Sequence, residues 1–225
     1  MPGGPIQDYS AFYEDIYAYI GFPLEPKHQM AAAEISEAEL RLGIRAPRAH
    51  SAYYEVAGRR DEFNRCLDEM HYPDQWFIQS DRLVFYQGHP ACVSYGIQLD
   101  RLSDDNPPVE MGNGARPTVW YDLSPTTTNF MQITTYWQGA YAGAMTNLEW
   151  AKVNPDLKLK LDADWEYLGE CNDMFCYRRP RQVACFLQWG DEWRLYAAGN
   201  TPEEPVKIGK DLDVEWMPWN AKSDS

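Results

Sequence analysis

The apolar residues of this chain change their spacing part-way along the sequence. Up to about residue 60 they recur at intervals of three and four, which is the period of an amphipathic helix. From Trp76 onward they stand in short runs separated by turn-forming residues, which is typical of strands. Helices followed by strands, with one more helix between two groups of strands, predict an α+β fold. We expect a mainly antiparallel sheet of about six strands with helices packed on one side.

Three helices are predicted in the first part of the chain. Asp8 is placed to cap the first of them. Ser36 followed by Glu39 is a capping-box pattern and predicts the start of the second. Pro47 is a favoured first residue for the third. The predicted helices cover residues 8–20, 35–43 and 47–58.

A later helix is predicted to begin at Ser124 as N-cap, with Pro125 in its first turn, and to run through Trp137. Residues 140–150 are expected to continue this helix. Ser80-Asp81 and Gly190-Asp-Glu are turn signals between strands. The predicted strands lie within residues 76–86, 91–97, 118–122, 175–178, 183–189 and 193–198.

Acidic residues outnumber basic ones by 34 to 20, which gives a formal net charge of −14. Such a chain repels phosphate backbones, so we expect no direct binding of nucleic acid. No apolar run approaches the roughly 18 residues of a membrane span, and the N-terminus lacks the pattern of a secretory signal. The five cysteines do not suggest a disulfide framework. We expect a cytoplasmic protein with reduced thiols.

The residues that usually carry catalysis or bind metals form no recognisable motif. Cys171 and Cys176 are separated by four residues and Cys185 follows nine later, whereas zinc sites use tighter pairs and four ligands. We therefore expect no metal, no cofactor and no enzymatic activity. Two Cys–His combinations remain open as nucleophile pairs, namely Cys66 with His71 and Cys92 with His89.

The chain is rich in large aromatic residues, with 9 Trp and 15 Tyr. Two interpretations are open. Aromatic side chains form platforms for sugars and anchors for protein partners. They also fill the space between a sheet and its helices, which is the more frequent role.

Residues 34–150 resemble a known family in the order of their features. Glu34–Pro47 looks like the family's acidic opening helix, which ends in Leu-Gly-x-x-x-Pro. Tyr53–Gly58 looks like its next helix. The best match is Asp105-Asn-Pro-Pro-Val109, which resembles the family's proline-pair loop. The first strands of the family resemble residues 73–76, 83–87 and 93–97 of this chain.

That family is the SUKH superfamily, which includes bacterial immunity proteins and a yeast regulator of cell-wall synthesis. No Gly/Ser linker divides the chain, so we expect one domain over residues 1–225, in which residues 151–225 either extend the sheet or form an appended lobe. Its best-matching core would be 34–150, with a helical extension at 1–33 and further strands at 151–225. The resemblance implies a non-catalytic protein that binds and neutralises a cognate toxin domain inside the cell, such as a basic nuclease. A net charge of −14 is compatible with this role, because it would steer the chain onto a basic partner.

We expect the partner to bind at the proline-pair loop and its surroundings. The candidate residues are the acids Asp104, Asp105 and Glu110, with Trp76 and Tyr86 as aromatic anchors. A general intracellular interaction module with another partner is the alternative. A domain that binds a small ligand through aromatic side chains, or a hydrolase without a visible motif, is a third interpretation.

Overall fold

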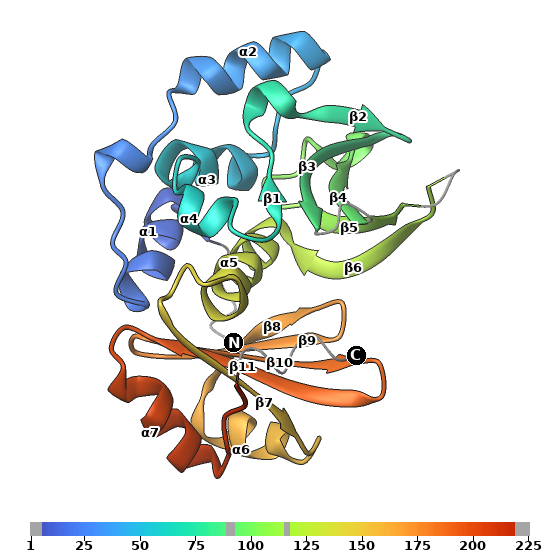
Figure 1. Cartoon of the computed structure of the whole chain (residues 1–225). Coiled ribbons are helices and arrows are strands. Elements are labelled where there is room, and N and C mark those ends of the chain that lie inside the picture. The colour runs from blue at the N-terminus through green and yellow to red at the C-terminus, as the bar shows by residue number, and fades with distance from the viewer. Residues whose placement is uncertain (1–5, 89–92, 115–117, 219–225) are drawn as a thin grey trace. The chain divides into compact units, whose positions relative to one another are not determined.

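The computed structural model describes residues 6–88, 93–114 and 118–218. The chain divides into two compact units (Figure 1). The first unit comprises residues 1–18 and 22–131, and the second comprises residues 19–21 and 132–225. The predicted strand start at Ala91 and the pairing of Cys92 with His89 lie outside the described residues. No helix in the described part of the chain is long and apolar enough to cross a membrane.

The helices of the first unit gather on one side of its sheet (Figure 1). They are α1 (Tyr9–Tyr19), α2 (Ala32–Leu42), α3 (Arg48–Ala57) and the short α4 (Asp61–Asn64), with 3-10 turns at Pro26–His28, Pro73–Gln75 and Leu99–Arg101. The positions of α1 and α3 confirm the helices predicted from apolar spacing. Asp8 caps α1 as predicted, since its Oδ1 accepts the N–H of Ala11 at 3.0 Å.

Helix α2 begins earlier than its sequence predicts. Its first residue is Ala32, so the predicted cap Ser36 lies inside the helix. The start is stabilised by Glu34, whose Oε2 accepts the N–H of Ala31 at 3.1 Å. The predicted end is confirmed at Gly43, which adopts a left-handed conformation with φ of 66°.

The sheet of the first unit has six antiparallel strands, in the order β1-β3-β4-β5-β6 with β2 paired to β3. Ser80 and Asp81 connect β2 to β3 with φ angles of 47° and 59°, as a primed hairpin turn requires. The strands are β1 (Glu69–Met70), β2 (Phe77–Gln79), β3 (Arg82–Gly88), β4 (Val93–Gln98), β5 (Pro108–Asn113) and β6 (Trp120–Thr126).

Aromatic side chains form much of the core of the first unit. Phe130 packs its ring against those of Phe85, Tyr86 and Tyr95, with centroid distances of 5.7, 5.3 and 5.0 Å. All except Tyr95 are fully or almost fully buried. For these residues the packing interpretation of the aromatic content holds.

Helix α5 (Thr127–Trp137) starts later than predicted. Ser124 and Pro125 belong to β6, which continues to Thr126 because that residue pairs with Pro108 of β5. A short π-helical turn (Gln138–Ala142) follows α5, and then the strand β7 (Asn147–Val153) stands where residues 140–150 are predicted to be helical. Tertiary pairing outweighs the local helix signal here.

The second unit has a separate five-stranded antiparallel sheet, in the order β7-β11-β10-β9-β8. Its further strands are β8 (Glu166–Cys171), β9 (Met174–Arg179), β10 (Gln182–Trp189) and β11 (Glu192–Gly199). The predicted hairpin turn at Gly190 is confirmed, with φ of 61°. The predicted α+β class with antiparallel pairing is therefore confirmed, but the strands form two sheets.

Two helices that the sequence does not predict complete the second unit, namely α6 (Leu157–Asp164) and α7 (Glu203–Leu212). Leu161 of α6 and Ile208 of α7 are fully buried in one cluster with Phe186 of the sheet. Burial of these aliphatic side chains against the sheet holds both helices in place.

Candidate functional site

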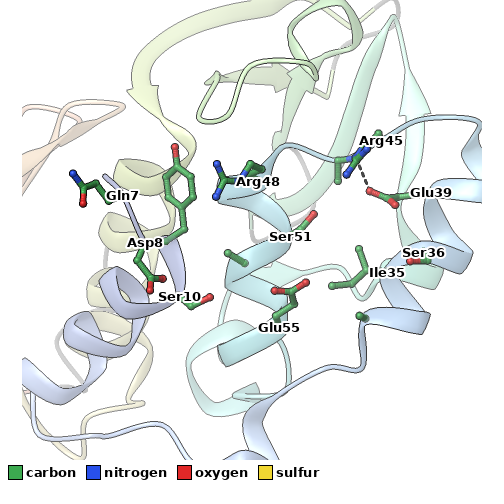
Figure 2. A pocket seen from close by; sticks show the side chains of 14 residues that line it. Gln7, Asp8, Ser10, Ile35, Ser36, Glu39, Arg45, Arg48, Ser51 and Glu55 are labelled. Atoms are coloured by element: carbon green, nitrogen blue, oxygen red, sulfur yellow. Dashed lines mark hydrogen bonds between the residues drawn. The ribbon is translucent and has the colours of Figure 1, made fainter. Parts of the chain in front are cut away.

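Two neighbouring hollows in the first unit lie on either side of the segment Gly43–Arg48. The first has a volume of about 530 Å³ and is bounded by the start of α1, by α2 and by α3. In Figure 2 Asp8 lies towards one end of this hollow, Glu39 and Arg45 lie at the other, and Glu55 lies between them on α3. Its lining is mostly polar and of mixed charge.

The second hollow has a volume of about 670 Å³. One wall is the same segment, 43–48. The opposite wall contains half-buried Leu99 and Leu102 together with Asp104 and Asp105. Two of the predicted partner-binding acids therefore lie in one hollow.

Asp105 joins its loop to helix α3 through two contacts. Its carbonyl oxygen accepts the N–H of Ala49 at 2.9 Å, which satisfies one of the free donors in the first turn of the helix. Its carboxylate Oδ2 lies 3.3 Å from Nη1 of Arg48. The two side chains are 58% and 67% exposed, respectively, so this ion pair contributes little stability.

Arg48 also lies beside a tyrosine that lines the first hollow. Its guanidinium carbon is 5.8 Å from the ring centroid of Tyr9. Burial is the main cause that raises the pKa of Tyr9, and the negative charge of Asp105 raises it further, while Arg48 opposes the change. Tyr9 is therefore a neutral hydrogen-bonding group at neutral pH.

Asp104 has an arginine partner of its own. Its Oδ2 accepts a hydrogen bond from Nε of Arg101 at 2.7 Å, and both side chains are about half exposed. This contact is the main cause that raises the pKa of Arg101. The charges of Asp104 and Asp105 are thus each balanced locally, in pairs that water screens strongly.

Arg45 is a residue of the site that sequence reasoning missed. It lines both hollows and is exposed, and among the residues the structure describes it forms no ion pair. The adjacent Glu39 holds this segment, because its Oε1 accepts the N–H of Ala46 at 2.8 Å. An arginine in a loop carries no sequence signal that separates it from other surface arginines.

The third predicted acid, Glu110, does not line either hollow. It lies on β5, where its Oε2 accepts a hydrogen bond from Nε of Arg82 at 2.8 Å. The Arg82 guanidinium carbon is 5.5 Å from the ring centroid of Trp120. Only 15% of the Glu110 side chain is exposed, so it serves the packing of the sheet surface.

The two predicted aromatic anchors are buried. Trp76 is 1% exposed, and its Nε1 donates at 3.2 Å to the hydroxyl of Tyr54 and to the carbonyl of His71. Tyr86 is also 1% exposed and donates to Asp68 at 3.2 Å. Neither ring is presented to a partner, because Tyr86 packs against Tyr95 and Phe130 in the core and the hydrogen bonds of Trp76 fix its ring there.

The candidate nucleophile Cys66 is exposed, and partial burial of its thiol raises its pKa. A raised pKa keeps the sulfur in the less reactive thiol form. Its candidate partner His71 is largely buried, which lowers the pKa of its imidazole. Among the described residues no three His, Cys, Asp or Glu side chains are grouped so that they could hold a metal ion.

Comparison with protein-family models, with curated proteins and with solved structures gives no match to this chain. The two hollows are the candidate site. Their open, mostly polar surface with weakly held ion pairs suits contact with another macromolecule whose side chains can replace those pairs.

Proposed function

We propose that this chain is a non-catalytic immunity protein of the SUKH type, which binds and neutralises a basic toxin domain in the cytoplasm. The excess of acidic side chains is the observation that carries the proposal. Residues 1–131, which include both hollows, contain 19 acidic and 10 basic side chains, a net charge of −9. A surface of this sign raises the rate at which a basic domain associates.

The local ion pairs are compatible with such a partner. Exposed pairs such as Arg48–Asp105 and Arg101–Asp104 contribute little to stability, because water screens their charges. A lysine or arginine of the toxin can therefore take the place of Arg48 or Arg101 at little cost. Leu99 and Leu102 supply apolar surface at the same position. In the proposed contact, basic side chains of the toxin replace the ion-pair partners at the rim, and apolar surface is buried in the hollow.

The test is rescue from a toxin encoded beside this gene. The toxic C-terminal domain of the neighbouring secreted protein is expressed with and without this chain, and survivors are counted. We expect survival together with co-purification of the two proteins. If a well-folded and well-expressed chain rescues no neighbouring toxin, the immunity function is wrong.

Charge reversal tests where the toxin binds. Asp104→Lys with Asp105→Lys changes the net charge by four units, and so does the control Glu14→Lys with Asp15→Lys. The control residues are adjacent and exposed on α1, away from both hollows. Since long-range steering changes equally in both variants, the first should slow association several-fold more than the control. Equal rates would place the interface elsewhere.

A further inference from the structure

Two buried cysteines face each other in the sheet of the second unit. Cys176 on β9 and Cys185 on β10 are direct partners in the antiparallel register. Their sulfur atoms are 3.5 Å apart, and both residues are fully buried. Only the two-residue turn Pro180-Arg181 connects the strands, so both thiols are held near each other by local pairing.

This geometry is close to that of a disulfide. Residues that face each other on antiparallel strands have Cα atoms about 4.5–5.5 Å apart, and disulfides span Cα distances of about 4.4–6.8 Å. The sulfur atoms need to approach by about 1.5 Å to reach the usual bond length of about 2.05 Å. Small side-chain rotations provide this movement, and the backbone register can stay as it is.

We propose that Cys176 and Cys185 form a disulfide site, which closes by exchange with a small disulfide oxidant such as oxidised glutathione. One cysteine thiolate attacks the oxidant, forms a mixed disulfide and releases one reduced glutathione. The other cysteine loses its proton and attacks the protein sulfur of that mixed disulfide. The protein disulfide forms, and the second reduced glutathione leaves. Two electrons and two protons pass from the protein to the oxidant.

Burial determines when the site reacts. The hydrogen bond with Cys185 and desolvation raise the pKa of Cys176 well above its usual range. The folded pair therefore contains little thiolate and is closed to the oxidant. Exchange should occur while the sheet assembles or transiently opens, and the finished bond should then be protected from reductant.

The experiment maps which cysteines become linked. The full chain is refolded with oxidised and reduced glutathione, its free thiols are blocked, and it is digested with trypsin without reduction. The expected product joins peptide 161–178 to peptide 182–194, with fragmentation assigning the bond to Cys176 and Cys185. Cys171, which is also buried, provides the competing partner within the first peptide.

Oxidation of the unfolded chain in denaturant is the control. There the shorter loop between Cys171 and Cys176 closes more readily, so linkage within peptide 161–178 should exceed linkage to Cys185. Native conditions should reverse this order.

The variant Cys171→Ala should keep the 176–185 bond, and oxidation should raise the unfolding midpoint of this variant by roughly 5 °C or more. The same mixture of products in both conditions, or no linked peptide under native conditions, would overturn the proposal.

Discussion

The imidazole of His50 lies in the core of the first unit, with its ring centroid 4.7 Å from that of Trp76. Phe85 lies at the same distance and Tyr54 at 5.0 Å. Among the described residues neither ring nitrogen of His50 has a hydrogen-bond partner. Complete burial lowers its pKa to about 3, so the ring is neutral in the folded protein.

This relationship predicts acid sensitivity. In the unfolded chain His50 has an ordinary pKa of about 6.5, so that state takes up a proton more readily as the pH falls. The stability linked to the neutral His50 is therefore fully present above about pH 6.5 and is lost progressively as the pH falls towards 3. At pH 4.5 the loss should be about 2–3 kcal/mol.

Urea unfolding at pH 7.5 and pH 4.5 measures this loss in the wild type and in His50→Leu. The variant should show a smaller difference between the two pH values, whatever its absolute stability. His28 and His71 also have lowered pKa values and contribute in the same direction, which leaves a residual slope. An unchanged difference in the variant would show that His50 is not the group responsible.

Asn64 is predicted to be a sensitive polar residue of the core. It is 1% exposed, its Oδ1 accepts from the hydroxyl of Tyr53 at 2.7 Å, and its Nδ2 donates to the carbonyl of Ala57 at 2.8 Å. Asn64→Ala removes both hydrogen bonds and should cost about 1–3 kcal/mol. Denaturant midpoints at constant m-value report the change. The variant Tyr53→Phe also removes two hydrogen bonds, because the Tyr53 hydroxyl lies 2.8 Å from that of Tyr17 as well, and it should cost a similar amount.

Two of the arginine–carboxylate pairs of the first unit should differ in strength. Arg82 and Glu110 have side chains only 21% and 15% exposed, whereas Arg101 and Asp104 are 48% and 45% exposed. Arg82→Met leaves a mostly buried carboxylate without this partner and should cost about 1–2 kcal/mol. Arg101→Met should cost much less, because water screens this exposed pair. Similar losses in chemical denaturation would refute this ranking.

Arg45 should affect binding and leave stability unchanged. Because it forms no ion pair among the described residues, Arg45→Glu should leave the unfolding free energy within about 0.5 kcal/mol of the wild type. The change makes the rim of both hollows more acidic, so association with a basic toxin should become several-fold faster at low salt. Stopped-flow mixing measures this association rate. An unchanged rate would show that the hollows are not part of the interface.

Local chemistry allowed part of the fold to be predicted. The cap at Asp8 and the positive-φ turns at Ser80-Asp81 and Gly190 depend on neighbouring residues alone, and the structure confirms them. Helix α6 shows where this approach fails. Leu157, Leu159 and Leu161 alternate as in a strand, yet they form a helix that buries the first and last and leaves Leu159 71% exposed. Packing against the sheet decides between the helical and the strand period. The spacing of residues in the sequence does not reveal this packing.

The candidate site was predicted only in part for the same reason. Asp104 and Asp105 follow a turn and precede two prolines, which indicates an exposed loop, and in the structure Asp105 is exposed and Asp104 is half-buried. Whether Trp76 and Tyr86 face solvent depends on which side of the sheet the helices cover. That information arises only when the strands and helices assemble.

The backbone hydrogen bond between Asp105 and Ala49 makes the first turn of helix α3 sensitive to movement of the loop that contains Asp105. A ligand that pulls the loop outward would break this contact and leave the amide of Ala49 open to solvent. A ligand that presses the loop inward would shield it. Amide hydrogen exchange in the first turn of α3 can therefore reveal the direction in which a bound protein moves the loop, even where the complex resists crystallisation.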